Sequence, residues 1–234
     1  TILYYFTGTG NSLAAAKEIG AALGDCGIVP IASLMDTQGD IIPAADRVGI
    51  FCPVYFSGLP AMVAAFVERL DLTGTKYIFS VVTFGGSGDA PTLRQLDAIL
   101  KKRSGRGLDA GFGVRMPGNY VLMYETPTGA KRERLLNGAK EELATIAREV
   151  GEGRKRDLPR SFLMQAIHAL LYPRFISRVH DNDRKFSVSD TCTSCGTCVE
   201  VCPAKNIGLV NKRPAWKHHC ELCCACLHFC PVEA

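Results

Sequence analysis

The chain has 234 residues, a formal net charge of +4 at pH 7 and 47% hydrophobic residues. Its length predicts one large domain or two smaller ones. The hydrophobic fraction is that of an ordinary globular protein and excludes a low-complexity chain. It also allows a core of useful size without help from disulfides.

The first 150 residues alternate between predicted strands and helices. Apolar runs predict the strands, and apolar residues at helical spacing predict the helices. The expected strands are Ile2–Phe6, Ile28–Ile31, Arg47–Cys52, Lys76–Thr83 and Leu108–Met116. The expected helices are Asn11–Leu23, Leu59–Leu70, Pro91–Lys102 and Gly129–Val150. This alternation implies an α/β fold with a parallel sheet covered on both faces, and five strands favour the doubly wound, flavodoxin-like order 2-1-3-4-5.

Details of three helices can be predicted as well. Asn11 or Ser12 is expected to cap the first helix. The last of the four is amphipathic and is expected to turn Leu135, Leu136, Leu143, Ile146 and Val150 to one side. A further helix is expected in Ser161–Ile176, ending near Pro173.

A hydroxyl-rich glycine loop follows the first predicted strand and leads into a helix. It reads Thr7-Gly8-Thr9-Gly10-Asn11-Ser12. Glycines let the backbone close around a phosphate, and N–H groups at a helix start face the anion. The loop lacks the Lys of a Walker A motif, and Leu13 stands where a Rossmann motif needs its third glycine. A loop that holds one terminal phosphate without a cation resembles that of flavodoxin, whose ligand is FMN.

The ends of the third and fourth strands offer groups that suit a flavin ring. Ligands of such sheets bind beyond the carboxyl ends of the strands. The third strand is followed by Pro53, Val54, Tyr55, Phe56, Ser57 and Gly58, and the fourth ends in Thr83, Phe84, Gly85 and Gly86. Tyr55 and Phe84 could be ordinary packing residues, but their place at adjacent strand ends favours flavin contact.

Positive charge is concentrated between two neutral parts. Residues 1–150 hold 15 basic and 15 acidic residues, whereas residues 151–185 hold 8 and 4. The basic stretch could meet an acidic partner or an anionic lipid surface, but we favour a solvated linker. We therefore expect a flavodoxin-like FMN domain at 1–153, a helical, basic linker at 154–185 and a bacterial-type ferredoxin domain at 186–234.

The C-terminal part repeats one cysteine motif. The two copies are Cys192-x2-Cys195-x2-Cys198-x3-Cys202-Pro and Cys220-x2-Cys223-x2-Cys226-x3-Cys230-Pro. This spacing is the signature of bacterial ferredoxins with two [4Fe–4S] clusters, in which the fourth cysteine of each run serves the other cluster. One cluster is then expected on Cys192, Cys195, Cys198 and Cys230, and the other on Cys220, Cys223, Cys226 and Cys202. A small hairpin turning at Asn211-Lys212 is expected between the runs.

Zinc is the alternative metal, but structural zinc sites pair two C-x2–4-C units, which this doubled pattern does not match. Cys26 and Cys52 are expected to be small buried hydrophobes, and Cys224 has no assigned role. Thr1–Phe6 does not match a signal peptide, and Ser161–Ile176 is too polar to span a bilayer. A cytoplasmic protein without a membrane span is expected.

The whole chain resembles the flavodoxin–ferredoxin fusion proteins of anaerobes, often called EFR-type ferredoxins. The resemblance rests on Thr7–Ser12, on Met116-Pro117-Gly118-Asn119-Tyr120 and on the doubled cysteine motif. It implies an electron carrier with FMN and two [4Fe–4S] clusters, with Asn119 and Tyr120 at the ligand edge of the sheet. Its partners would be redox proteins of unknown identity, and nothing indicates nucleic-acid recognition.

Three functions remain open from the sequence. The first is electron transfer between the clusters and FMN, coupling one- and two-electron partners without a catalytic residue. The second is an FMN-dependent reductase of a small molecule, with Tyr120 or Tyr124 as proton donor. The third is an empty docking or sensor module. We favour the first.

Overall fold

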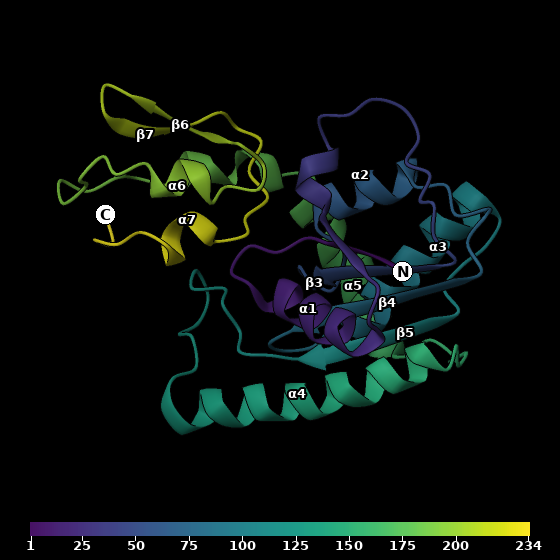
Figure 1. The fold of residues 1–234 in the computed structure, drawn as a ribbon. Helices are drawn as coiled ribbons and strands as arrows, with labels where there is room; N and C mark the ends of the chain where they lie inside the picture. The colour runs from purple at the N-terminus through teal and green to yellow at the C-terminus, as the bar shows by residue number, and fades with distance from the viewer.

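The computed structural model describes all residues, 1–234, and contains one large parallel sheet. Its strands are β1 (Ile2–Tyr5), β2 (Gly27–Pro30), β3 (Arg47–Pro53), β4 (Tyr77–Phe84) and β5 (Ala110–Arg115). They pair in the order β2-β1-β3-β4-β5 (Figure 1). The predicted fold class and strand order are therefore confirmed.

Helices cover both faces of this sheet. α1 (Asn11–Leu23) and α4 (Gly129–Gly151) pack on one face, and α2 (Ala61–Arg69) and α3 (Asp89–Ser104) on the other. Successive residues of a strand point to opposite faces. In β4, Ile78 and Val82 enter the core beneath α2 and α3, while Phe79 and Val81 enter the core beneath α1 and α4. Such fully apolar strands are typical of a parallel sheet buried on both sides.

Three details differ from the sequence prediction. Gly10, which has no side chain to offer a hydrogen bond, caps α1, while the expected caps Asn11 and Ser12 bond to Pro117 and Thr83 instead. The first turns of α4 run past the sheet (Figure 1), so Leu136 is exposed and the buried face begins at Ala139. α5 (Phe162–Ile176) continues through Pro173. Pro173 lacks the N–H that would bond the Ala169 carbonyl, so the helix continues with one backbone hydrogen bond fewer in its last turns.

Residues 186–234, which we call the cysteine-rich module, contain short elements only. These are α6 (Thr197–Glu200), β6 (Ile207–Val210), β7 (Arg213–Trp216) and α7 (Ala225–His228). β6 and β7 form the predicted hairpin, and Asn211 and Lys212 both have positive φ, as a tight two-residue turn requires. Short 3-10 helices lie at Ile31–Leu34 and Val179–Lys185, the second leading into the module.

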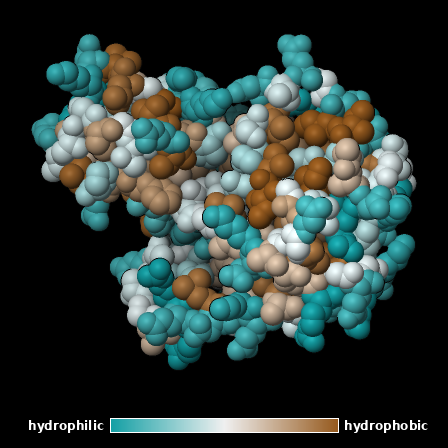
Figure 2. All heavy atoms as spheres, viewed as in Figure 1, coloured by the Kyte–Doolittle hydropathy of each residue, from teal (hydrophilic) through white to brown (hydrophobic).

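The cysteine-rich module forms a separate lobe beside the larger body. In Figure 2 a notch on the left of the view separates this lobe from the body below it. The segment between β5 and α4 rises towards α7 (Figure 1), and there the His228 side chain meets the backbone of Asn119. None of the helices has the length and apolar run that crossing a bilayer requires.

Candidate functional site

A cavity of about 330 Å³ lies at the carboxyl-terminal edge of the large sheet. Its walls come from the loops after β1, β3, β4 and β5, from α5, and from residues 222–224 of the cysteine-rich module. We call it the strand-end cavity. Ligands of doubly wound sheets bind at this edge, so the cavity is where a cofactor of this fold would lie.

All but two of the predicted flavin-site residues line the strand-end cavity. Those that line it are Thr7, Gly8, Thr9, Asn11, Ser12, Pro53, Val54, Tyr55, Phe56, Ser57, Thr83, Phe84, Gly85, Gly86, Asn119 and Tyr120. The exceptions are Gly10, which caps α1 with a φ of 108°, and Gly58, which lies against the ring of Tyr172. These two glycines shape the loops rather than face the cavity.

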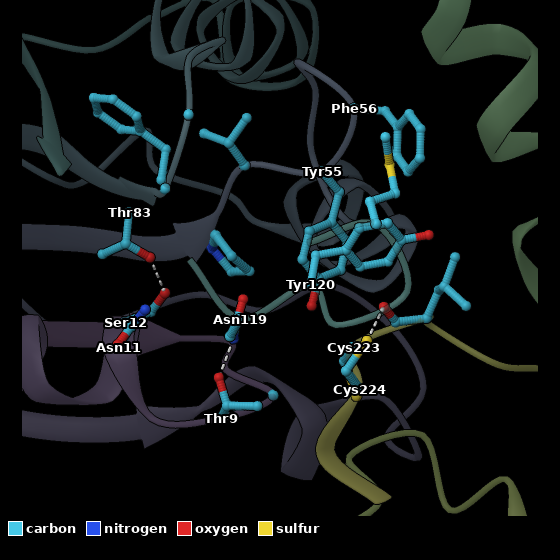
Figure 3. Close-up of a pocket in the computed structure, with 18 of the residues that line it drawn as sticks. Thr9, Asn11, Ser12, Tyr55, Phe56, Thr83, Asn119, Tyr120, Cys223 and Cys224 are labelled. Atoms are coloured by element: carbon cyan, nitrogen blue, oxygen red, sulfur yellow. Dashed lines mark hydrogen bonds between the residues drawn. The ribbon is translucent and has the colours of Figure 1, made fainter. Parts of the chain in front are cut away.

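Hydroxyl groups gather at the end of the cavity nearest α1 (Figure 3). The Ser12 and Thr83 hydroxyl oxygens lie 2.8 Å apart, and the Gly10 N–H donates to Thr7 Oγ1 at 3.0 Å. No Lys, Arg, Asp or Glu lines the cavity. An anion at this end would therefore meet hydroxyl groups and the first N–H groups of α1, which carry the positive end of the helix dipole.

The segment after β5 closes against this loop. The Asn11 amide donates to the Pro117 carbonyl at 3.0 Å, and the Asn119 amide donates to the Thr9 hydroxyl. Two asparagines thus tie the loops after β1 and β5 together across the sheet edge. The Met-Pro-Gly-Asn-Tyr segment therefore lies at the predicted ligand edge of the sheet.

Aromatic rings form the other end of the cavity, as the labelled side chains in Figure 3 show. Phe56 stacks on Phe175 with ring centroids 4.4 Å apart, and Tyr120 meets Phe56 edge-on. Phe56 and Ser57 have φ values of 47° and 62°, a left-handed conformation that costs a non-glycine residue roughly 1–2 kcal/mol. Strain of this kind gathers at functional sites, where packing holds it in place. The end suits a flat, largely apolar ring system.

Helix α5 supplies part of this wall, which the sequence did not predict. Leu171 and Phe175 line the cavity. The helix is held by the Tyr172 hydroxyl, which donates to the Leu59 carbonyl at 2.7 Å, and by His168, whose Nδ1 lies 2.9 Å from the Ser57 carbonyl. The apolar character of residues 162–176 indicates that this helix packs on another part of the chain. Nothing in the local sequence indicates which part of the chain it covers.

Other cavity residues were also missed, namely Ser87, Met123, Leu222, Cys223 and Cys224. Pro117 and Tyr124 also line the cavity; the sequence indicates Pro117 only as part of the family motif and Tyr124 only as a candidate proton donor. Burial raises the pKa of Tyr120 above its usual value. Burial also raises the pKa of Tyr55 well above its usual value, with a further contribution from Cys223 and Cys224. Both phenols stay neutral at physiological pH and can donate hydrogen bonds.

The eight motif cysteines line two smaller cavities. The first cysteine cavity, of about 50 Å³, is bordered by Cys192, Cys195, Cys198 and Cys230. The second, of about 20 Å³, is bordered by Cys202, Cys220, Cys223 and Cys226. Cys226 also touches the first. Each cavity thus collects three cysteines of one run and the last cysteine of the other, as the ferredoxin pattern requires.

Neighbouring groups at these cavities suit iron–sulfur clusters. The backbone N–H groups of Asn206 and Ala234 donate to Cys202 Sγ and Cys230 Sγ, each at 3.3 Å. Trp216 borders both cavities, and its indole N–H is buried without a protein acceptor. A cluster sulfur is an acceptor of the kind this donor lacks. No three Cys, His, Asp or Glu side chains converge on a single-ion site.

Two family models match parts of this chain. Residues 2–111 match a family described as a flavodoxin domain, and residues 188–207 match a 4Fe-4S binding domain. The second match contains the first cysteine run only. A search of curated proteins gave no match.

Solved structures with a similar fold include a flavodoxin and an azoreductase, both of low sequence identity. The Megasphaera elsdenii flavodoxin is 21% identical, with a TM-score of 0.36, over 60% of this chain and 98% of that chain. An azoreductase from Bacillus anthracis is 12% identical, with a TM-score of 0.43, over 64% of this chain and 99% of that chain. Because these TM-scores are low, the assignment of the two domains is based on the two family matches alone.

Proposed function

We propose that this chain, which joins a flavodoxin domain to a 4Fe-4S ferredoxin-type domain, passes electrons between FMN and two [4Fe–4S] clusters. It would thereby couple one-electron and two-electron partners, in the anaerobic metabolism that the family resemblance implies. The observation that carries the proposal is the shared wall of the two sites. Cys223 and Cys224 border both the strand-end cavity and the second cysteine cavity.

Residues of the strand-end cavity would hold FMN at its two ends. Ser12, Thr83 and the first turn of α1 would bind the phosphate, and Tyr55, Phe56 and Tyr120 would bracket the ring. The flavin supplies chemistry of one or two electrons, and a cluster supplies one. The protein positions these groups, excludes water and sets their potentials through hydrogen bonds and burial.

The eight motif cysteines would hold the clusters in the two sets that the cavities collect. These are Cys192, Cys195, Cys198 and Cys230 for one cluster, and Cys220, Cys223, Cys226 and Cys202 for the other. We place the boundaries at 1–153, 154–185 and 186–234, with α5 packed on the flavodoxin domain through His168 and Tyr172.

The experiment is an anaerobic preparation in which iron, sulfide and flavin are counted per chain. Two clusters and one flavin predict about eight irons, about eight sulfides and one FMN. About four irons would reduce the proposal to one cluster. Failure to bind FMN at all would remove the electron-transfer role from the strand-end cavity.

A reductase function has one observation in its favour, since Tyr120 and Tyr124 both line the cavity and Tyr120 stays protonated. Anaerobic stopped-flow mixing with NADH distinguishes the two functions. The carrier requires that NADH alone leave the flavin oxidised, whereas rapid bleaching would establish a hydride-accepting site.

A further inference from the structure

The two cysteine runs differ in their relation to the strand-end cavity. Within the cysteine-rich module, only Leu222, Cys223 and Cys224 line that cavity. No residue of the first run does so. Figure 3 shows Cys223 and Cys224 beside the aromatic end, next to Tyr55 and Tyr120. The second run therefore forms a wall common to the two predicted cofactor sites, and the first run lies behind it.

This wall is in close contact with the phosphate loop. A Cβ placed on Gly8 would collide with the Cys223 carbonyl oxygen and would lie 2.8 Å from Cys223 Cβ. Such distances exclude any side chain at residue 8 unless the backbone moves. Gly8 thus permits the loop after β1 to lie directly against a predicted cluster ligand.

Two hydrogen bonds hold the same segment on either side of this contact. The Glu221 carboxylate, which is 4% exposed, accepts from the Met62 N–H at 3.1 Å, at the start of α2. On the other side, His228 Nε2 lies 2.7 Å from the Asn119 carbonyl. Both bonds join the cysteine-rich module to loops of the large sheet, so residues 221–228 are fixed at the strand-end cavity.

The internal repeat singles out Cys224. The two runs have the same backbone, with positive φ at Ser194 and Leu222 and again at the next helix cap. At that cap the first run has Gly196, with a φ of 82°, and the second has Cys224, with a φ of 61°. Glycine adopts this conformation freely, but cysteine does not. The second run therefore has a strained backbone at Cys224, a residue that borders the strand-end cavity and is 4% exposed.

We propose that the second-run cluster is the direct electron partner of the flavin, with Cys223 and Cys224 as the connecting segment. The first-run cluster is then the outer centre, which exchanges electrons with an external one-electron protein. This inference rests on the proposed function. Cys195, the one exposed motif cysteine, belongs to the first run, as an outer centre requires.

In the direction of flavin reduction, the external protein donor would lose one electron to the cluster held by the first run. The electron would then move to the cluster held by the second run and from there to the flavin. Two such transfers, with two protons taken from water, would complete the two-electron reduction.

Laser-flash photoreduction of the holoprotein tests this order. Photoexcited deazaflavin delivers one electron, and absorbance changes then follow its redistribution between clusters and flavin. Cys192→Ala should remove the outer cluster, leaving about four irons, and should retain the redistribution phase. Cys224→Ala removes no ligand and should slow that phase several-fold, whereas Cys26→Ala, a cysteine substitution outside all three cavities, should not change it.

Each outcome bears on the order of the centres. Loss of redistribution in Cys192→Ala, with one cluster and the flavin still present, would overturn the proposal. An unchanged rate in Cys224→Ala would remove Cys224 from the connecting segment. If Cys192→Ala fails to assemble, Cys224→Ala still tests the proposal, because both clusters remain in that variant and an unchanged rate would overturn the connection through Cys223 and Cys224. Wild-type protein without flavin or clusters would instead refute the proposed function.

Discussion

At the residue scale, Cys224 shows how a repeated motif can depart from itself at one position. Its φ of 61° is shared with Gly196 of the first run, so the backbone is dictated by the motif and not by the side chain. The left-handed conformation costs a residue with a Cβ about 1 kcal/mol. The strained backbone of Cys224 thus destabilises the wall of the strand-end cavity, and such strain is common at functional sites.

Cys224→Gly should therefore stabilise the holoprotein by about 1 kcal/mol, although it removes a buried side chain. The measurement is the apparent unfolding temperature at a fixed heating rate. Gly196→Ala, at the matching position of the first run, should lower it by a similar amount. A lower unfolding temperature for Cys224→Gly would mean that packing of the thiol outweighs the backbone strain.

Tyr77 offers a pH prediction at the same scale. Its hydroxyl donates to the Arg154 carbonyl at 2.6 Å, and burial raises its pKa to about 12. The unfolded phenol ionises near pH 10. Between these values the unfolded state has lost the proton that the folded state keeps, so stability falls as pH rises. Tyr77→Phe should flatten this fall between pH 10 and 12 in denaturant titrations, and an unchanged slope would assign it to other groups.

At the element scale, the start of α1 is built to receive an anion. Gly10 leaves the first N–H groups without a side-chain cap, and the Ser12 hydroxyl points to Thr83 at 2.8 Å. A hydrogen bond to a charged group is worth about 1.5–3 kcal/mol. Ser12→Ala should thus weaken FMN binding by at least roughly tenfold, measured by titration of flavin-stripped protein. Riboflavin, which lacks the phosphate, is the control ligand, and equal losses for both would place the phosphate elsewhere.

The packing of α5 against the loop after β3 depends on one glycine. A Cβ on Gly58 would enter the ring of Tyr172, which also approaches Leu59. Overpacking of this kind costs typically about 1–3 kcal/mol. Gly58→Ala should destabilise the protein by that amount and alter the fluorescence of the bound flavin. Gly74→Ala is the matched control, because a Cβ at residue 74 would meet open space. Equal stability of the two variants would mean that α5 shifts at little cost to accommodate the added methyl group.

Sequence reasoning located the elements well because their signals are local. Largely apolar runs such as Tyr77–Phe84 predict buried strands wherever they occur, and Thr7–Ser12 predicts an anion site from its own backbone chemistry. The role of α5 and of residues 222–224 was not predictable in this way. Gly8 and Cys223 are adjacent only in the folded chain, and no periodicity in either segment records the other. Contacts between segments far apart in the sequence depend on how the folded elements fit together, and a single sequence does not record that fit.

At the scale of the whole molecule, the proposed electron transfer between the two lobes requires that they stay in one arrangement. The Glu221 carboxylate binds the start of α2 from the neighbouring lobe, and burial raises its pKa to about 7. The Lys205 ammonium also pairs with Asp36, but both side chains are largely exposed, so this pair contributes little. The buried contact at Glu221 and the partly buried contacts at Gly8 and His228 therefore hold the lobes together.

Glu221→Ala should loosen this arrangement without unfolding either lobe. The Met62 N–H would lose its acceptor, so its hydrogen exchange should accelerate by roughly ten- to a hundredfold, corresponding to about 1–3 kcal/mol for a buried hydrogen bond. Electron redistribution after a flash should slow in parallel, with iron and flavin contents unchanged. Glu200→Ala alters an exposed acid of the same module and should leave both readouts as in the wild type. Met62 exchange could instead accelerate while redistribution keeps its rate. The hydrogen bond between Glu221 and Met62 would then have a structural role only, and the contact between Gly8 and Cys223 would suffice to keep the second-run cluster beside the flavin.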